Sequence, residues 1–181
     1  MYKYLPTDVY LSIYDIDFTK LYAWGIKNII ADLDNTLLPY YIKEPTPELK
    51  EWLSKLKTQG IKFYIISNNK TERIQKVVNL LSIDGFLANA HKPSAQRTKR
   101  YLEQQNLSLS ETLFIGDQLV TDIKCANNLG IRSILVKTID LKTQKWYTKI
   151  NRIREKSIIK RITNINKQLG TKIQQLYEEE N

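Results

Sequence analysis

The fold is indicated most clearly by residues 26–37, which read IKNIIADLDNTL. The first part, Ile26 to Leu33, is largely apolar and does not alternate, which is typical of a buried strand in a parallel sheet covered on both faces. Two carboxylates, Asp32 and Asp34, follow where that strand should end. Ligands of open α/β sheets bind beyond the carboxyl ends of the strands. This stretch therefore predicts a central strand with a ligand site next to it.

Working outward, short apolar runs alternate with helical stretches. Thr46 and Pro47 are the expected cap and first residue of a helix that ends at Gly60. Asn69 is the expected cap of the next helix, with Glu72 completing a capping box. Repeated strand–helix units predict an open parallel-sheet α/β sandwich with helices on both faces. Its further strands are expected at residues 62–67, 86–90, 113–116 and 132–136, with helices near 94–105 and 121–129.

Length and composition exclude several classes of protein. The 181 residues form about one domain, and the single cysteine, Cys125, permits no internal disulfide. Cys125 lies in an apolar helical pattern and is expected in the core. The sequence contains no apolar run of the roughly 18 residues that a membrane span needs, and the first residues lack a signal-peptide pattern. The expected location is cytoplasmic.

The net charge of +9 is concentrated near the C-terminus. Residues 142–172 contain ten Lys or Arg and one acid, Glu155, while the rest of the chain carries 18 basic and 18 acidic residues. Apolar residues recur there every three to five positions, which predicts a basic amphipathic helix, broken near Ser157 or Gly170. Three roles stay open for this segment: packing on its own domain, peripheral contact with an anionic inner membrane face, and RNA binding.

Polar residues follow the predicted strands in a set that suits phosphoryl transfer: Asp32, Asp34, Ser67, Asn68, Lys92, Asp117 and Asp122. Attack on a phosphate monoester needs a nucleophile, a proton donor for the leaving oxygen, and positive charge on the phosphoryl oxygens. Because a carboxylate nucleophile repels a dianionic phosphate, a Mg²⁺ ion is expected. Asp32 and Asp117 are the expected metal ligands, and Asp122 is placed to hold a metal-bound water.

The remaining side chains complete that chemistry. Asp34 can protonate the leaving group and then activate water, while Lys92 supplies fixed positive charge. Ser67 offers a hydroxyl donor to a phosphoryl oxygen. Thr36 is expected to hold the nucleophile loop, and Tyr40 and Tyr41 to line an open crevice.

These residues resemble the four motifs of the haloacid dehalogenase (HAD) superfamily over residues 26–136. The segment DLDNTL at 32–37 matches the first motif, Ser67 the second, Lys92 the third, and GDQLVTD at 116–122 the fourth. The resemblance implies a Rossmann-like phosphatase in which Asp32 is the nucleophile and Asp34 the general acid/base. It also implies that the Asp34 backbone carbonyl joins Asp32 and Asp117 on Mg²⁺, and that Ser67, Asn68 and Lys92 bind the phosphate.

The spacing between the motifs leaves no room for an inserted cap domain, and in this the chain resembles the capless subfamily III (IIIA). The SNN and GDQLVTDI segments resemble the YqeG family. That family is related to phosphatidylglycerophosphate phosphatases, which makes phosphatidylglycerophosphate the most specific substrate expected. The alternatives are a nucleotide, sugar-phosphate or phosphoprotein phosphatase, or an RNA- or ribosome-binding module with secondary hydrolysis. The expected division is an N-terminal extension at 1–25, a phosphatase core at 26–138 and a basic helical segment at 139–181.

Overall fold

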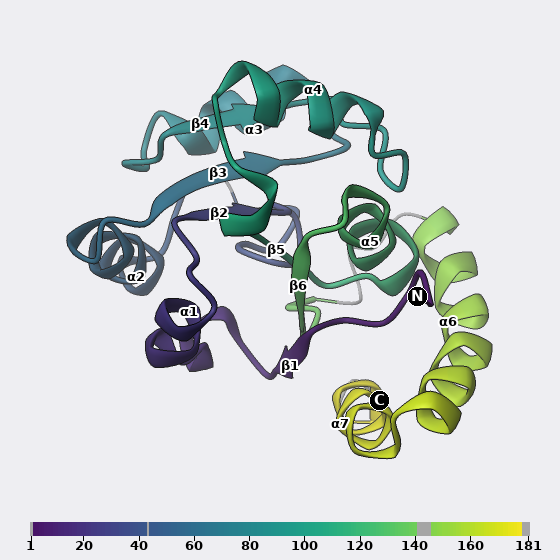
Figure 1. Ribbon diagram of the computed structural model, residues 1–181. Helices are drawn as coiled ribbons and strands as arrows, with labels where there is room; N and C mark the ends of the chain where they lie inside the picture. Colours follow the sequence, from purple (N-terminus) through teal and green to yellow (C-terminus); the bar gives the residue numbers. More distant parts are fainter. Residues whose placement is uncertain (1, 43, 141–145, 179–181) are drawn as a thin grey trace.

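The computed structural model describes residues 2–42, 44–140 and 146–178, with side chains described from residue 154 onward in the last range. Within these residues six parallel strands form one sheet in the order β1-β6-β5-β2-β3-β4 (Figure 1). The strands are β1 (Asp8–Tyr10), β2 (Asn28–Ala31), β3 (Lys62–Ile66), β4 (Gly85–Leu87), β5 (Thr112–Gly116) and β6 (Arg132–Val136). The predicted open parallel α/β sandwich is confirmed.

Three strands differ from the sequence prediction by more than one residue, and one of them, β4, ends at Leu87 rather than at the predicted Ala90. The central strand β2 is shorter than the predicted 26–33, because the Ile26 amide bonds back to the Leu21 carbonyl before the strand begins. The edge strand β1 was not expected as a strand. It lies in the N-terminal extension and pairs with β6, with Asp8 opposite Ile134. Three residues are too few to show a periodic pattern, so only pairing with β6 defines this strand.

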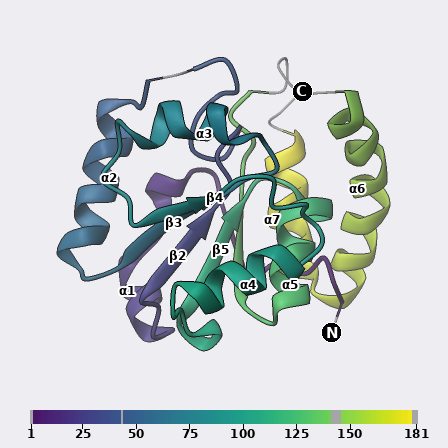
Figure 2. The same ribbon diagram turned by 90° about the horizontal axis from the view of Figure 1, so that it is seen from above.

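Helices cover both faces of the sheet (Figures 1 and 2). The apolar stripes of α1, α2 and α3 pack on one face, against Ile29, Ile65 and Ile115, and those of α4 and α5 pack on the other, against Ile30 and Phe114. Cys125 is buried on α5, as predicted. The helices are α1 (Phe18–Ala23), α2 (Pro47–Thr58), α3 (Thr71–Val78), α4 (Gln96–Gln104), α5 (Lys124–Leu129), α6 (Trp146–Ile165) and α7 (Lys167–Glu178), with short turns η1 (Ile13–Asp15), η2 (Leu109–Glu111) and η3 (Leu119–Ile123).

The two predicted helix caps had different outcomes. Thr46 caps α2 as expected, since its hydroxyl accepts a hydrogen bond from the Leu49 amide at 3.1 Å. The capping box at Asn69 and Glu72 was wrong. The cap position of α3 is Lys70, which makes no side-chain cap bond, and the Asn69 side chain instead donates to the Asp34 carboxylate. A contact with the site therefore replaces the local capping bond.

The C-terminal segment forms two helices that pack on the β1–β6 side of the sheet (Figure 1). The break is at Asn166, at neither Ser157 nor Gly170, and the Asn166 side chain caps α7 by accepting from the Leu169 amide. Apolar residues of both helices are buried against Val9 and Leu135: Ile158, Ile159, Ile162, Leu169, Ile173 and Leu176. Packing on its own domain is thus observed. None of the described helices combines the length and apolar character needed to cross a membrane.

Helices α6 and α7 lie close together at Gly170. A Cβ placed there would lie 2.3 Å from the Thr163 Oγ1 and 2.5 Å from its backbone Cα, so the helices would have to separate. Gly170→Ala is expected to lower the free energy of unfolding by about 1–3 kcal/mol. Urea denaturation measures this, with Gln168→Ala at an exposed position of α7 as the control. Equal denaturation midpoints for the two variants would contradict the expectation.

Candidate active site

The predicted site residues meet at the carboxyl ends of the central strands. Asp32 directly follows β2, Ser67 follows β3, and Asp117 follows β5, while Lys92 lies on the loop after β4. Strands β2 and β5 are neighbours, but the chain continues from β2 to β3 on one side and from β5 to β6 on the other. The site therefore lies at the switch point in strand order, where open α/β sheets bind ligands.

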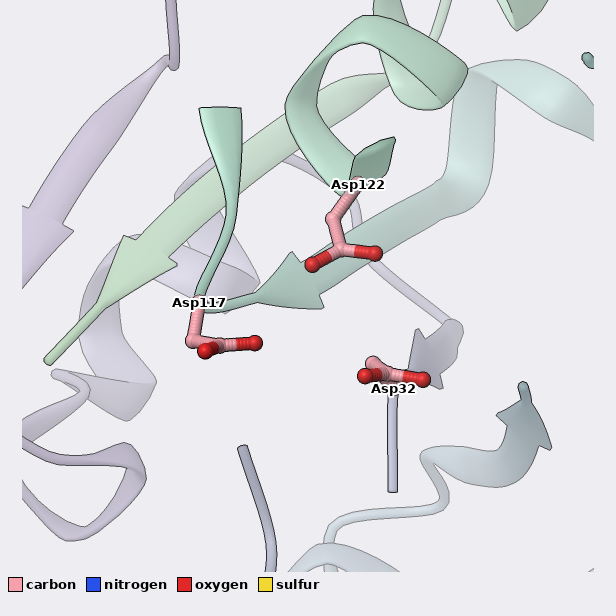
Figure 3. A group of neighbouring side chains, drawn as sticks. All are labelled: Asp32, Asp117 and Asp122. Atoms are coloured by element: carbon pink, nitrogen blue, oxygen red, sulfur yellow. The ribbon is translucent and has the colours of Figure 1, made fainter. Parts of the chain in front are cut away.

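Three carboxylates, Asp32, Asp117 and Asp122, converge at this point (Figure 3). Each offers an oxygen within 4.8 Å of the others, and all three residues are at most 8% exposed. Asp117 and Asp32 extend strand ends, whereas Asp122 comes from η3, a π-helical turn. Gly116 permits this approach, because a Cβ on it would lie 2.3 Å from the Asp122 Cβ. Such π-turns frequently occur at functional sites.

Lys92 provides positive charge inside the cluster. Its Nζ lies 2.8 Å from an oxygen of Asp32 and 2.7 Å from one of Asp122, and its side chain is 2% exposed. Burial by itself lowers the pKa of Lys92, but the carboxylates of Asp122 and Asp32 together outweigh it and raise that pKa. The Asn68 side chain fixes the Lys92 backbone, accepting from its amide at 2.7 Å and donating to its carbonyl at 3.0 Å.

The charges of this cluster favour a divalent cation. Three buried carboxylates lie close together here, and Lys92 forms ion pairs with two of them, Asp32 and Asp122. Burial raises the pKa of Asp32 from 3.8 to about 7, with Lys92 acting to lower it and Asp122 and Asp34 to raise it further. Hard carboxylate oxygens are the ligands that Mg²⁺ prefers, and a bound cation would offset the repulsion. The donor set fits such an ion.

Two hydroxyls orient Asp117. Thr36 donates to one oxygen at 3.1 Å, and Thr138 donates to the other at 2.9 Å. Thr36 therefore links the nucleophile loop to the strand-end carboxylate, in line with its expected holding role. Thr138 was missed by sequence reasoning, because it lies after the last predicted strand and outside every motif.

Asp34 is held by two residues that the sequence did not suggest. Arg73 donates from Nη2 to Asp34 Oδ1 at 2.8 Å, and Asn69 donates to the other oxygen. Ser67 is buried, and its hydroxyl accepts from the Asn69 amide at 3.2 Å. Arg73 lies four residues after Asn69, on the first turn of α3. From the sequence, an arginine at such a position is expected to face solvent, so its contact with Asp34 could not be predicted.

Glu155 on α6 reaches the loop that carries the fourth motif. This carboxylate is fully buried and accepts from the backbone amides of Leu119 at 2.8 Å and Val120 at 3.4 Å. Tyr177 on α7 donates to its second oxygen at 2.8 Å. Since Leu119 is two residues after Asp117, the C-terminal helices support the backbone between the two site carboxylates of that loop.

A family model described as haloacid dehalogenase-like hydrolase matches residues 17–136. The chain belongs to the haloacid dehalogenase-like hydrolases. It is 35% identical over 156 residues to the Bacillus subtilis (strain 168) protein named "Probable phosphatase YqeG", covering 86% of this chain and 90% of that protein. The resemblance to the HAD superfamily and the YqeG family is thereby confirmed, and the hydrolase is a phosphatase.

Solved structures of low sequence identity share the fold of this hydrolase. The cobalt-bound deoxy-D-mannose-octulosonate 8-phosphate phosphatase from Haemophilus influenzae matches with a TM-score of 0.52 at 17% identity, covering 65% of this chain and 70% of that one. An uncharacterized protein from Listeria monocytogenes serotype 4b matches with a TM-score of 0.51 at 18% identity, covering 70% and 99%. At these identities the match supports the sheet architecture alone.

The raised pKa of Asp32 predicts a pH dependence of stability in the metal-free hydrolase. Because the pKa is 3.8 in the unfolded chain and about 7 in the folded one, folding favours the protonated form. The stabilising contribution is complete below the unfolded pKa and is lost as pH rises through about 7. In EDTA, the melting temperature of the wild type is expected to fall relative to that of Asp32→Asn between about pH 5 and about pH 8. Parallel melting curves would contradict this.

Proposed function

We propose that this phosphatase is Mg²⁺-dependent and hydrolyses phosphatidylglycerophosphate through an aspartyl-phosphate on Asp32. The observation that carries the proposal is the convergence of Asp32, Asp117 and Asp122 within 4.8 Å at the switch point of the sheet. Asp32, Asp117 and the Asp34 backbone carbonyl would hold the ion, and Asp122 would hold a water bound to it. When bound, Mg²⁺ supplies positive charge that reduces the repulsion between Asp32 and the phosphoryl oxygens.

The side chains of this chain perform the remaining steps. Asp32 attacks phosphorus, a new P–O bond forms, and the bond to the leaving oxygen breaks while Asp34 gives that oxygen a proton. Asp34 then takes a proton from water as the water attacks the aspartyl-phosphate, which releases phosphate and restores Asp32. Lys92 and Ser67 contact the phosphoryl oxygens. Asn68 has a second task besides its predicted substrate contact, since its side chain holds the Lys92 backbone.

The substrate proposal rests on the likeness to the YqeG protein and on an expected open site. In the sequence, about 30 residues separate the first two motifs, which leaves no space for a cap domain. A site without a cap needs the substrate or a surface to exclude water, which favours a large or membrane-held phosphate. Exposed basic residues of α6 and α7 support peripheral contact with anionic lipid: Arg154, Lys156, Lys160, Arg161, Lys167 and Lys172.

Phosphate release from a substrate panel tests this function. The panel contains phosphatidylglycerophosphate in detergent micelles, nucleotides and sugar phosphates, each with Mg²⁺ and with EDTA. We expect Mg²⁺-dependent release that is fastest from the lipid. If the enzyme leaves the lipid untouched and hydrolyses a soluble ester, the substrate proposal fails and the alternative phosphatase functions gain support. No release at all, together with salt-sensitive RNA binding, would favour the binding module.

The domain division from the sequence is kept as part of the proposal. The phosphatase core would comprise residues 26–138, with the extension at 1–25 and the helical segment at 139–181 attached to it. The pairing of β1 with β6 and the bonds of Glu155 to the fourth-motif loop support a single cooperative unit made of all three segments.

A further inference from the structure

A pocket of about 640 Å³ adjoins the acid/base residue Asp34. Tyr40 and Tyr41, from the loop after β2, line one part, and residues at the start of α3 line another. Two of its lining residues, Asn69 and Arg73, also donate hydrogen bonds to the Asp34 carboxylate. The pocket is therefore contiguous with the place where the leaving group of a substrate would depart.

Arg73 is the residue in this pocket with unused donors. Its Nη2 bonds Asp34, but Nε and Nη1 are buried without a hydrogen-bond partner among the described residues. The side chain is 17% exposed, and its guanidinium carbon lies 5.7 Å from the centre of the Tyr40 ring. Buried donors that lack an acceptor are rare and costly. A planar guanidinium pairs especially well with phosphate-type oxyanions, which would supply the missing acceptors.

The charges around Arg73 also favour an anion. Among the described residues that line the pocket, the three cations Lys70, Arg73 and Lys76 are opposed by the acid Glu72, which gives them a net charge of +2. Helix α3 begins here without a side-chain cap, and the N-terminal end of a helix attracts negative charge. Surface lysines alone would be ordinary solvated groups. The partly buried Arg73, with its unpaired donors, distinguishes this pocket from such a surface.

We infer that this pocket, called here the tail pocket, binds a second anionic group on the leaving alcohol of the substrate. The preferred substrates are then phosphate monoesters whose alcohol carries another phosphate-type anion a few bonds away. Arg73 contacts Asp34 and that anion together, which would align the leaving oxygen with Asp34. The inference rests on the proposed phosphatase function. It gives a charge-based reason why a lipid monoester that also carries a phosphodiester would be preferred over the monoester of a neutral alcohol.

Binding of inert phosphonates tests the tail pocket without any turnover. Calorimetry with the full chain and Mg²⁺ compares propylphosphonate, 3-aminopropylphosphonate and 3-phosphonopropanesulfonate, whose tails are neutral, cationic and anionic. We expect the anionic tail to bind about 10- to 100-fold more tightly than the neutral one, and the cationic tail most weakly. In Arg73→Gln and in Lys76→Gln, the ratio of the affinities for the anionic and the neutral tail should fall by about tenfold or disappear. Equal affinities of the wild type for all three would overturn the inference.

The matched control is Lys62→Gln. Lys62 is exposed at the first residue of β3, whereas the tail pocket lies beyond the other end of that strand. Lys62→Gln removes one positive charge, as Lys76→Gln does. If the net charge of the protein alone caused the preference for the anionic tail, both variants would lose that preference equally. The preference is expected to survive in Lys62→Gln. An equal loss in both variants would overturn a localised pocket.

Hydrolysis separates the tail pocket from the phosphatase function. The substrates are propyl phosphate, 3-sulfopropyl phosphate, phosphatidylglycerophosphate and its deacylated headgroup. Equal kcat/KM for the lipid and its headgroup would assign recognition to the soluble anion, and a higher value for the lipid would add a contribution from the membrane-held form. Selective binding without any hydrolysis supports the pocket and removes the proposed function. Hydrolysis and binding that ignore the tail charge overturn the pocket and leave the phosphatase intact.

Discussion

Asp32→Asn is expected to reduce Mg²⁺-dependent phosphate release by about 10⁴-fold or more, because an amide oxygen cannot form the aspartyl-phosphate. Asn has nearly the same shape as Asp, so the fold should be retained. Asp32 is 8% exposed, and one of its carboxylate oxygens lies 2.8 Å from Lys92 Nζ, which places it inside the carboxylate cluster. Initial rates at saturating Mg²⁺ measure the loss.

A trapping experiment distinguishes loss of the nucleophile from loss of the metal. Acid quenching of wild type during turnover of a ³²P-labelled substrate should leave label on the protein, and Asp32→Asn should carry none. Asp122→Asn is the informative comparison, because Asp122 belongs to the same cluster but is not the proposed nucleophile. If Asp32→Asn kept activity comparable to that of Asp122→Asn, another residue would have to be the nucleophile.

Glu155→Ala is expected to lower the free energy of unfolding by about 2–4 kcal/mol, a large fraction of the stability of an ordinary domain. The change removes the side-chain acceptor of the Leu119 and Val120 amides, and it removes one hydrogen bond of the Tyr177 hydroxyl. Buried donors without partners are among the named causes of severe destabilisation. Urea denaturation monitored by fluorescence measures the effect.

The same variant should also weaken Mg²⁺ activation, since these amides belong to the loop between Asp117 and Asp122. The Mg²⁺ concentration for half-maximal activity is expected to rise about tenfold or more in Glu155→Ala. Glu155→Gln keeps one acceptor oxygen, so its stability and its Mg²⁺ requirement should lie between those of the wild type and Glu155→Ala. Lys156→Ala, at the exposed neighbouring position, is the control for α6. An unchanged denaturation midpoint in Glu155→Ala would remove this role from Glu155.

The two effects expected for Glu155→Ala, on stability and on Mg²⁺ activation, imply that the C-terminal helices belong to the catalytic unit. Their apolar residues are buried against β1 and β6, and Glu155 is the one acid of the basic segment 142–172. A helix that used its apolar stripe to enter a membrane would have to give up these contacts. Any lipid contact is therefore proposed through the exposed basic side chains, with both helices remaining docked.

The sequence by itself determined the sheet class and the residues at its strand ends. Continuous apolar runs of four or five residues indicate burial on both faces of a sheet, so strands β2, β3, β5 and β6 could be located from the sequence. Carboxylates and a lysine directly after such runs needed no long-range information. The motif order then placed Asp32, Ser67, Lys92 and Asp117 at one edge, where the structure brings them together.

Only the tertiary structure decided which residues support that edge. Thr138, Arg73 and Glu155 contact the site carboxylates or their loop from positions 21, 39 and 36 residues away in the chain. Asn69 donates to Asp34 and does not form its predicted cap, because a hydrogen bond to a charged carboxylate is stronger than one to a neutral backbone group. Local periodicity reports what a residue does within its own helix or strand. It carries no information about which distant carboxylate or amide a side chain will meet, and that choice is made when the elements pack.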